Sequence, residues 1–471
     1  MSRPRLGRGL AGLGLVLALA LFGGARAQGA FSPAPWLQDL DQLRDAMTTG
    51  YSNLEWQAQR GLDLPALYAR ARQRIAAAHD DYEARRAIER FLTAFGDGHL
   101  EVRWPAAAAP SPAAGPPPPL CDRLGYFDLR DEGGAALPMA GVTPVGSADA
   151  HLKAGLVTVA GRRVGILRVG MFSPHGFPDI CATVASRLKL TPASPCHDPC
   201  QDAFDRAADA LFVDEMAAQL RALAAARADA LLVDISGNGG GGDSSLALAR
   251  MVTARPLTRP RGGAVRGAAW AATLASRQAE AEAALKVASP RDRPALQRFA
   301  AALAEARAET SKSCDRAPLW LGRPIACTAL VPEPLLDGSW SSVPPPGDPV
   351  AAARPVWTGP VIVLVDGDSA SSSEWFAAML QDARAALIVG APTVGAGCGH
   401  MTDAPPVKLI HSGGTVSMPD CYRLRANGDN EAGGVEPDLL VAFREHDSQR
   451  QRTARLARVL PLALARAPVA R

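Results

Sequence analysis

From residue 164 onward, the apolar residues of this chain alternate between two patterns. Unbroken apolar runs predict strands buried on both faces, and they lie at residues 164–169, 230–235 and 361–365. Runs with apolar residues at helical spacing predict helices, and they lie at residues 203–226, 244–252 and, after a serine cluster, up to residue 382. Shorter strands are expected at residues 386–389 and 407–410. Strands that alternate with helices predict an α/β core around a mainly parallel sheet.

The regions before and after this core differ from it in composition. Residues 28–103 have mostly helical patterns and predict a small N-terminal helical domain. Residues 104–160 start with a Pro/Ala-rich stretch (104–119), which predicts a stiff linker, and continue as a short β-rich segment. We expect the core at residues 161–448, followed by an Arg-rich amphipathic tail at 449–471.

One segment inside the core lacks strand signals. Residues 262–310 are rich in Ala, Glu and Arg and have few strand-forming residues. They lie between two predicted core strands. We therefore expect a helical insertion, placed where it could shape or gate access to a site.

The start of the chain has the organisation of a secretory signal. Three arginines precede a short apolar stretch at residues 10–22, and Ala25-Arg26-Ala27 fits a cleavage site. We expect a signal peptide at residues 1–27 and a mature chain that begins near Gln28. This predicts an exported protein, periplasmic or secreted, with no stable membrane insertion once the signal is removed.

Length and charge narrow the class of protein further. The 471 residues are enough for two to three domains, and 48% hydrophobic residues are typical of a globular protein. Loss of residues 1–27 would change the formal net charge from +3 to −1, because they contain four arginines and no acidic residue. A mature chain this close to neutral gives no support for a nucleic-acid partner.

The cysteines indicate disulfides rather than a metal site. There are 8, an even number, which in an exported protein favours disulfide bonds. Cys314–Cys327 and Cys398–Cys421 are the preferred pairs because each closes a short loop. Cys196-His197-Asp198-Pro199-Cys200 could suggest a metal site, but its spacing does not match a common zinc site, so a disulfide or a loop is favoured. Nothing in the sequence requires a metal or an organic cofactor.

A serine cluster stands where the apolar run at residues 361–365 gives way to a helix. A serine at such a junction lies beside the positive end of the helix dipole and its free N–H groups. Those groups can serve a nucleophile and an oxyanion hole. However, Ser371 and Glu374 also have the spacing of a capping box, in which the serine only closes the helix end.

A run of four glycines follows the strand predicted at residues 230–235. Asn238 precedes Gly239 to Gly242, and a predicted helix follows them. Backbone N–H groups in such a turn can bind an anion. The run lacks the residues of a phosphate-binding loop, so an oxyanion hole and a simple tight turn remain the two interpretations.

Two of the eight histidines lie in glycine-rich turns. His99 stands in Phe95-Gly96-Asp97-Gly98-His99-Leu100, and His400 follows Gly395-Ala396-Gly397-Cys398-Gly399. A lone histidine in a loop is usually a surface residue. These two become candidates for a catalytic role only because the chain also contains the serine and glycine motifs.

Taken together, four ordered motifs resemble the C-terminal processing (tail-specific) serine peptidases, a superfamily that includes the tricorn core and the interphotoreceptor retinoid-binding repeats. The motifs are Asp234-Ile235-x-x-Asn238 with its glycines, Ser369 to Glu374 with Gln381-Asp382, Gly390-x-Pro392-Thr393-x-Gly395, and Gly434-Val435-Glu436-Pro437-Asp438. The resemblance implies a crotonase-like α/β core with its nucleophile at the strand-to-helix junction. By motif, the nucleophile falls on Ser371, with Asp382 as a supporting residue.

The chain departs from the tail-specific branch at the general base. That branch carries a lysine where this chain has Ala396, and alanine cannot accept a proton. The tricorn-like arrangement uses a histidine upstream of the sheet and a glutamate before the last motif, and His99 and Glu431 match those positions. The resemblance therefore implies a Ser371–His99–Glu431 triad, with His400 as the alternative base.

Two further features of the site follow from this match. The N–H groups of Gly240 or Gly241, together with that of Ser372, would form the oxyanion hole. Tail-specific enzymes usually carry a PDZ domain before the core. Here only about 65 residues separate His99 from the strand at residue 164, so no full PDZ domain is expected.

The sequence thus predicts an exported serine hydrolase, a peptidase that cleaves peptides or proteins through an acyl-enzyme on Ser371. The alternative is a non-catalytic binding protein on the same fold, holding a peptide or an apolar ligand. A third interpretation, acyl transfer on a non-peptide substrate, uses the same residues.

Overall fold

The structure is a computed structural model that describes residues 31–105, 117–129, 139, 141–147, 149–257, 261–332, 335, 350, 353–402, 404–444 and 446–468. The expected signal peptide at residues 1–27 lies outside the described residues. So does most of the expected Pro/Ala-rich linker, at residues 106–116.

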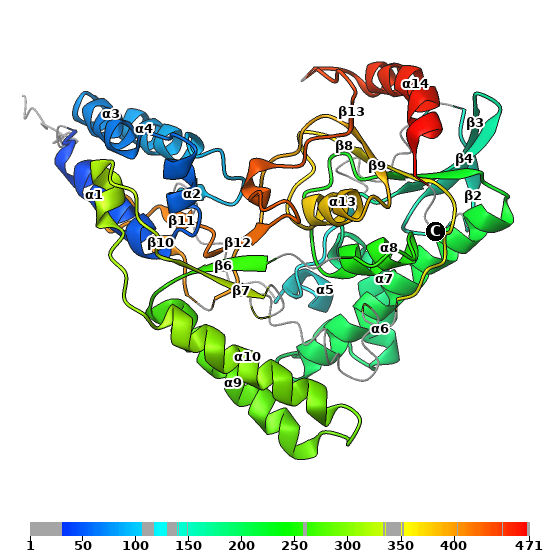
Figure 1. Cartoon of the computed structure of the whole chain (residues 1–471), viewed down its shortest axis with the longest axis horizontal. Helices are drawn as coiled ribbons and strands as arrows, with labels where there is room; N and C mark the ends of the chain where they lie inside the picture. The colour runs from blue at the N-terminus through cyan, green and yellow to red at the C-terminus, as the bar shows by residue number, and fades with distance from the viewer. Residues whose placement is uncertain are drawn as a thin grey trace, which may run out of the picture.

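A seven-stranded, mostly parallel sheet forms the core of the larger lobe, on the right in Figure 1. Its strands, in spatial order, are β13 (Leu439–Leu440), β9 (Leu387–Gly390), β8 (Val361–Val365), β5 (Ala230–Asp234), β4 (Arg162–Arg168), β3 (Ala154–Val159) and β2 (Thr143–Val145). The strands from β13 to β4 are parallel, whereas β3 and β2 run antiparallel to their neighbours. This confirms the expected α/β class, and the sheet begins earlier than expected because β2 and β3 belong to it.

The strand β8 shows why the apolar runs become central strands. All five of its residues are buried, and alternate side chains point to opposite faces of the sheet. Val361, Val363 and Val365 face one hydrophobic core, while Ile362 and Leu364 face a second one. A strand with helices on both faces needs apolar residues at every position.

Helices cover both faces of this sheet (Figure 1). One face packs against helices that share its larger core: α6 (Pro178–Arg187), α7 (Cys200–Ala225), α8 (Ser244–Met251) and α13 (Ser372–Asp382). The other face packs against α14 (Gln449–Arg466), through Leu456, Leu460 and Leu464. The segment expected as an Arg-rich tail is therefore a helix that contributes to the core.

The N-terminal region is helical, as the sequence predicts. It comprises α1 (Ala34–Gly50), α2 (Leu54–Gln59), α3 (Leu64–Ala76) and α4 (Asp81–Thr93). It does not stand apart from the rest of the chain, because β1 (Glu101–Arg103) pairs with β11 (Thr415–Ser417), which pairs with β10 (Val407–Lys408). The strand expected at residues 407–410 thus forms, but in this small sheet rather than in the central one.

The expected insertion is a helical hairpin mounted on a β-ribbon. It consists of β6 (Arg261–Val265), α9 (Ala268–Val287), α10 (Arg293–Thr310), the 3-10 helix η3 (Ala317–Leu321) and β7 (Thr328–Pro332), and β6 also pairs with β12 (Cys421–Leu424). The strand β6 escaped sequence analysis because it contains two glycines. Gly263 is needed there, since a Cβ at that position would lie 2.1 Å from the Tyr422 ring. Figure 1 shows the hairpin projecting away from the rest of the molecule.

Four disulfides join the eight cysteines. They are Cys121–Cys181, Cys196–Cys200, Cys314–Cys327 and Cys398–Cys421. Both preferred pairs are confirmed, as is the interpretation of Cys196 and Cys200 as a disulfide. Three short helices complete the described elements: α5 (Leu120–Arg123), η2 (Pro174–Gly176) and η4 (Glu431–Gly433). Within the described ranges, no helix is both long and apolar enough to cross a bilayer.

Candidate active site

Ser371 lies at the junction of β8 and α13, with its backbone in a strained conformation. Its φ is +56° and its ψ is −120°, which is unusual for a residue with a side chain. Ser371 and Glu374 form the expected capping box, in which the Ser371 N–H donates to Glu374 Oε2 at 2.9 Å. The half-buried serine is therefore held at the helix N-terminus by its own backbone.

Glu374 also holds a second segment of the chain. Its carboxylate accepts hydrogen bonds from Thr393 Oγ1 at 2.5 Å and from the N–H groups of Gly395 and Ala396, each at 2.7 Å. Burial raises the pKa of Glu374, and these hydrogen bonds act in the opposite direction. We call residues 393–399 the active-site segment, because it contacts the other candidate residues in turn.

The glycine run touches the nucleophile directly. A Cβ on Gly240 would lie 2.8 Å from Ser371 Cβ and 3.1 Å from Ser372 N, so only glycine permits this approach. The Ala370 N–H donates to Asn238 O at 3.0 Å, which ties the two loops together. Asn238 is itself anchored, since its Nδ2 donates to Val169 O at 2.9 Å.

One of the three expected oxyanion donors is already engaged. The Gly240 N–H donates to Asn238 Oδ1 at 2.8 Å, so in this conformation it cannot also bind an oxyanion. The N–H groups of Gly241 and Ser372 donate to no acceptor among the described residues. Of the two alternatives, Gly240 or Gly241, only the Gly241 N–H is therefore available in this conformation, while Gly240 brings the loop against Ser371.

His99 lies in the turn between α4 and β1, with its ring against the end of the active-site segment. A Cβ on Gly399 would come within 3.3–3.6 Å of three ring atoms, and the Gly98 N–H donates to Gly395 O at 3.3 Å. His99 Nδ1 is buried without a hydrogen-bond partner in the described part of the chain. Burial lowers the pKa of His99 and outweighs the nearby Asp97 carboxylate, so the ring is neutral at pH 7.

Glu431 lies in η4 and is 2% exposed. A Cβ on Gly397 would lie 3.5 Å from Glu431 Cβ, so the active-site segment also passes this residue. Burial raises the pKa of Glu431 to about 7, against the opposing charge of Arg423. Its Oε2 is buried and lacks a hydrogen-bond partner among the residues that the structure describes.

Buried hydrogen bonds connect the turn of His99 to the turn of Glu431. Asp97 accepts the His99 N–H at 3.1 Å on one oxygen, and the Asn53 amide at 2.8 Å on the other. Asn53 Oδ1 in turn accepts from Asn430 Nδ2 at 2.8 Å. Tyr51 adds a hydrogen bond from its hydroxyl to Asp97 at 2.9 Å. The relative position of the two turns is therefore set by satisfied polar groups that are costly to disturb.

The structure gathers the three expected triad residues around one segment, but it does not join their side chains. Within the described part of the chain, no hydrogen bond links Ser371, His99 and Glu431 to one another. Asp382 lies in an ion pair with Arg425, at 2.5 Å, and so supports the turn before Glu431 rather than Ser371. His400 is exposed, and its ring centroid is 6.3 Å from that of His99.

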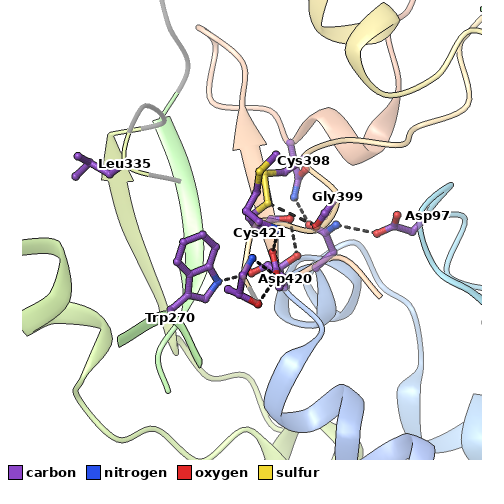
Figure 2. The surroundings of a disulfide bond; sticks show 12 residues. Asp97, Trp270, Leu335, Cys398, Gly399, Asp420 and Cys421 are labelled. Atoms are coloured by element: carbon purple, nitrogen blue, oxygen red, sulfur yellow. Dashed lines mark hydrogen bonds between the residues drawn. A yellow bond between two sulfur atoms is a disulfide. The ribbon is translucent and has the colours of Figure 1, made fainter. Parts of the chain in front are cut away.

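The Cys398–Cys421 disulfide anchors the active-site segment to β12 (Figure 2). Next to it, the Asp420 N–H donates to Gly399 O at 3.0 Å, and Trp270 Nε1 donates to Asp420 O at 2.7 Å. Gly399, which lies against the His99 ring, is thus linked through Asp420 to Trp270 in α9 of the insertion. The disulfide thus links this wall of the site covalently to β12.

A cavity of about 700 Å³ opens beside His400. It lies between the end of α1, the start of α9 and residues 402–420, and its apolar wall includes Val265, Trp270 and Met418. The insertion therefore forms part of a cavity close to the candidate base. Among the described residues, no cluster of three or more His, Cys, Asp or Glu side chains could hold a metal ion.

Two contributors were missed in sequence analysis. The capping-box spacing pointed to the contact between Glu374 and Ser371, but not to the three hydrogen bonds from the active-site segment. Asp97 stands in the same glycine-rich turn as His99, and that position was its only signal. Both act through partners more than 15 residues away in the sequence, which spacing cannot reveal.

Comparison with known proteins places this geometry in context. The sequence profile of peptidase family S41 matches residues 204–441, from within α7 to just beyond β13. The structure of mature CPAF complexed with lactacystin is similar with a TM-score of 0.57 and 16% identity, over 91% of this chain and 97% of that one. A second structure of mature CPAF gives a TM-score of 0.54 at 16% identity, over 93% and 99% of the two chains. At these identities, the structural similarity establishes a shared fold.

Proposed function

Because the chain belongs to peptidase family S41 and is a serine-type peptidase, we propose that it cleaves peptide bonds through an acyl-enzyme on Ser371. His99 acts as the general base and Glu431 orients its ring. The N–H groups of Gly241 and Ser372 bind the oxyanion.

The observation that carries this proposal is the course of the active-site segment. Its Gly395 binds the carboxylate that holds Ser371, its Gly397 lies against Glu431, and its Gly399 lies against the His99 ring. One short stretch of backbone therefore aligns all three residues. Unrelated surface residues would not be expected to lie along the same segment of backbone.

Two unpartnered atoms also support the pairing of His99 with Glu431. Nδ1 of His99 and Oε2 of Glu431 are both buried and lack hydrogen-bond partners in the described part of the chain. A buried polar atom without a partner costs about 1–3 kcal/mol. A hydrogen bond between the two, direct or through a water molecule, removes both penalties and orients the ring. Nε2 is then the nitrogen that faces the Ser371 hydroxyl.

The reaction follows from these positions. The Ser371 Oγ attacks the carbonyl carbon of the scissile bond while His99 takes the hydroxyl proton. The negative charge on the carbonyl oxygen is bound by the Gly241 and Ser372 N–H groups, each worth roughly 3 kcal/mol. His99 then gives its proton to the leaving amine as the C–N bond breaks, which leaves the acyl-enzyme. Water attacks this ester while His99 takes its proton, and His99 returns that proton to Ser371 Oγ as the acid product leaves. Catalytic hydrogen bonds are often long in the free enzyme and tighten when substrate binds.

The substrate is a peptide or protein, as the family implies, and the cavity beside His400 holds part of it. At about 700 Å³ it is large enough for more than one side chain, and its apolar wall favours apolar residues. The enzyme works outside the cytoplasm. Four disulfides and the signal-like first 27 residues support export.

The proposal is tested by labelling and turnover. A fluorophosphonate probe should label the wild-type protein and fail to label Ser371→Ala. The variant Ser373→Ala is the matched control in the same serine cluster. Its buried hydroxyl has no partner among the described residues, so its loss should leave labelling intact. Labelling that survives in Ser371→Ala would refute the nucleophile.

The base is tested with a second pair of variants. His99→Ala should reduce kcat/KM on a peptide substrate by about 10³-fold or more, whereas His400→Ala should change it by less than about tenfold. Full activity in His99→Ala, with loss in His400→Ala, would move the base to His400.

A further inference from the structure

Arg423 lies opposite Glu431 on a short antiparallel hairpin. Leu424 forms an antiparallel bridge with Asn430, and the Arg425 N–H donates to Asp429 O at 2.7 Å. If this register is continued by one residue, Arg423 lies opposite Glu431. Residues directly opposite in an antiparallel pair have Cβ atoms about 5 Å apart on one face. The hairpin therefore brings Arg423 within electrostatic range of Glu431, the residue at which η4 begins.

The position of Arg423 is fixed on two further sides. The side chain is 6% exposed, and its guanidinium carbon lies 4.8 Å from the centroid of the Trp375 ring. Trp375 is one helical turn after Ser371 in α13. Cys421, two residues before Arg423, is held by the disulfide to the active-site segment. A buried arginine held in this way is a permanent, well-placed positive charge.

The charge of Arg423 acts on both partners of Ser371. It lowers the pKa of Glu431, against burial, and it lowers the pKa of His99, in the same direction as burial. Other charged groups also face these two residues. Glu374 and Asp382 raise the Glu431 pKa and Arg425 lowers it, while Asp97 and Glu101 raise the His99 pKa and His400 lowers it. Arg425 is paired with Asp382, so most of its effect is offset.

We propose that Arg423 is a positioning residue for catalysis, whose fixed charge favours the ionised form of the Glu431 carboxyl and the neutral form of the His99 ring. This inference rests on the proposed triad. The reactive state needs exactly one proton on the ring and none on the carboxyl, since only then does the carboxylate orient the imidazole as a base. A positive charge that acts on both groups opposes protonation of either. Without it, burial would keep Glu431 protonated near neutral pH.

The test is the pH profile of kcat/KM on a peptide substrate for Arg423→Met, Arg423→Lys and the wild type. In Arg423→Met, both Glu431 and His99 should bind protons more readily. The acid limb should therefore move about one unit to higher pH, and kcat/KM at pH 7 should fall about tenfold, with recovery toward pH 9. Arg423→Lys keeps the charge and should keep the limb within about 0.3 unit of the wild type. An unmoved limb in Arg423→Met would overturn the proposal, whatever its melting temperature, as would a moved limb in Arg423→Lys.

A double-mutant comparison separates this role from simple packing. If Arg423 acts through Glu431, the tenfold loss at pH 7 should shrink to less than about threefold in a Glu431→Gln background. Equal losses in the two backgrounds would contradict the proposal. Should Arg423→Met fail to fold, Arg423→Gln carries the same comparisons.

The failure of this inference is distinguishable from failure of the proposed function. If Glu431→Gln alone keeps full activity, the triad is wrong. If Glu431→Gln is impaired but the limb of Arg423→Met is unmoved, only the role of Arg423 is wrong.

Discussion

The nucleophile and the proposed base are held by different kinds of structure. Ser371 stands at the end of a fully buried strand of the central sheet, and the glycine run of the proposed oxyanion hole follows the neighbouring strand, β5. His99 and Glu431 stand in turns outside that sheet. Buried polar side chains, the Cys398–Cys421 disulfide and the pairing of β1 with β11 hold those turns in place.

The positions of the nucleophile and of the base are therefore fixed by different kinds of interaction. The strand that carries the nucleophile is held by hydrophobic burial, which is large and not directional, and Glu374 adds hydrogen bonds at its end. The base side depends on hydrogen bonds that are directional and individually modest. Changes on the nucleophile side should therefore cost activity through close contacts. Changes on the base side should act through orientation and protonation.

The largest expected effect lies on the base side, at Glu431. Glu431→Gln should reduce kcat/KM by about 10³-fold, because an amide cannot stabilise the imidazolium. The folded-state pKa of about 7 lies above the unfolded value of 4.5, so wild-type stability falls as pH rises between these values. The variant lacks this loss. The free energy of unfolding of the variant, relative to that of the wild type, should therefore be up to roughly 3 kcal/mol higher at pH 8 than at pH 4.

Urea denaturation at pH 4 and pH 8, together with peptide turnover at pH 8, measures both effects. A variant that loses activity and also stability at pH 8 would show that Glu431 is a structural residue.

On the nucleophile side, the next largest effect is expected at Gly240. Gly240→Ala should reduce kcat by about 10²–10³-fold, because the new Cβ would lie 2.8 Å from Ser371 Cβ and 2.9 Å from Ala370 O. Gly239→Ala is the matched control, since no atom lies within 4 Å of a Cβ there. Equal losses in the two variants would mean that the contact between the glycine run and Ser371 is unimportant. Turnover under saturating peptide measures both.

A smaller effect is expected from Asp97, which anchors the turn of His99. Asp97→Asn places an amide where the carboxylate accepts hydrogen bonds from Tyr51, Asn53 and the His99 N–H. We expect about a tenfold loss of kcat/KM and a lower melting temperature. Steady-state kinetics and thermal unfolding at pH 7.5 test this. Asp80→Asn, at the exposed N-terminus of α4, is the control and should leave kcat/KM unchanged.

The smallest expected effect on activity comes from the disulfide. Replacing both Cys398 and Cys421 by Ser should lower kcat/KM by a few-fold, because hydrogen bonds at Asp420 still hold Gly399. Stability should fall by roughly 3 kcal/mol, as expected for a loop of this length. The same change at Cys196 and Cys200 should leave kcat/KM unaltered. If it impairs activity equally, the disulfide has no specific role at the site.

Much of the nucleophile side could be predicted from the sequence. The strand at residues 361–365 forms with the expected bounds, because a strand buried on both faces leaves a continuous apolar run. The α7 and α8 helices also lie where helical spacing indicated. The capping box at Ser371 is local, so spacing alone revealed it.

The base side was less predictable, because its contacts join residues far apart in the chain. The hydrogen bond from Asn430 to Asn53 joins residues 377 positions apart, and no local sequence pattern predicts it. The strand β6 carries little apolar signal and forms through pairing with β7 and β12. His99 and Glu431 were singled out only through resemblance to a family. The membership in family S41 also speaks against the alternative of a non-catalytic binding protein.

The pairing of β1 with β11 sets an order of events during synthesis. A nascent chain that has grown as far as α13 already carries the proposed nucleophile and base. It lacks β10, β11 and Glu431, which are made later. The wall that supports His99 cannot form until those residues leave the ribosome. The proposed triad is therefore incomplete until residue 431 has been made, and a chain that stops before residue 407 is expected to be inactive.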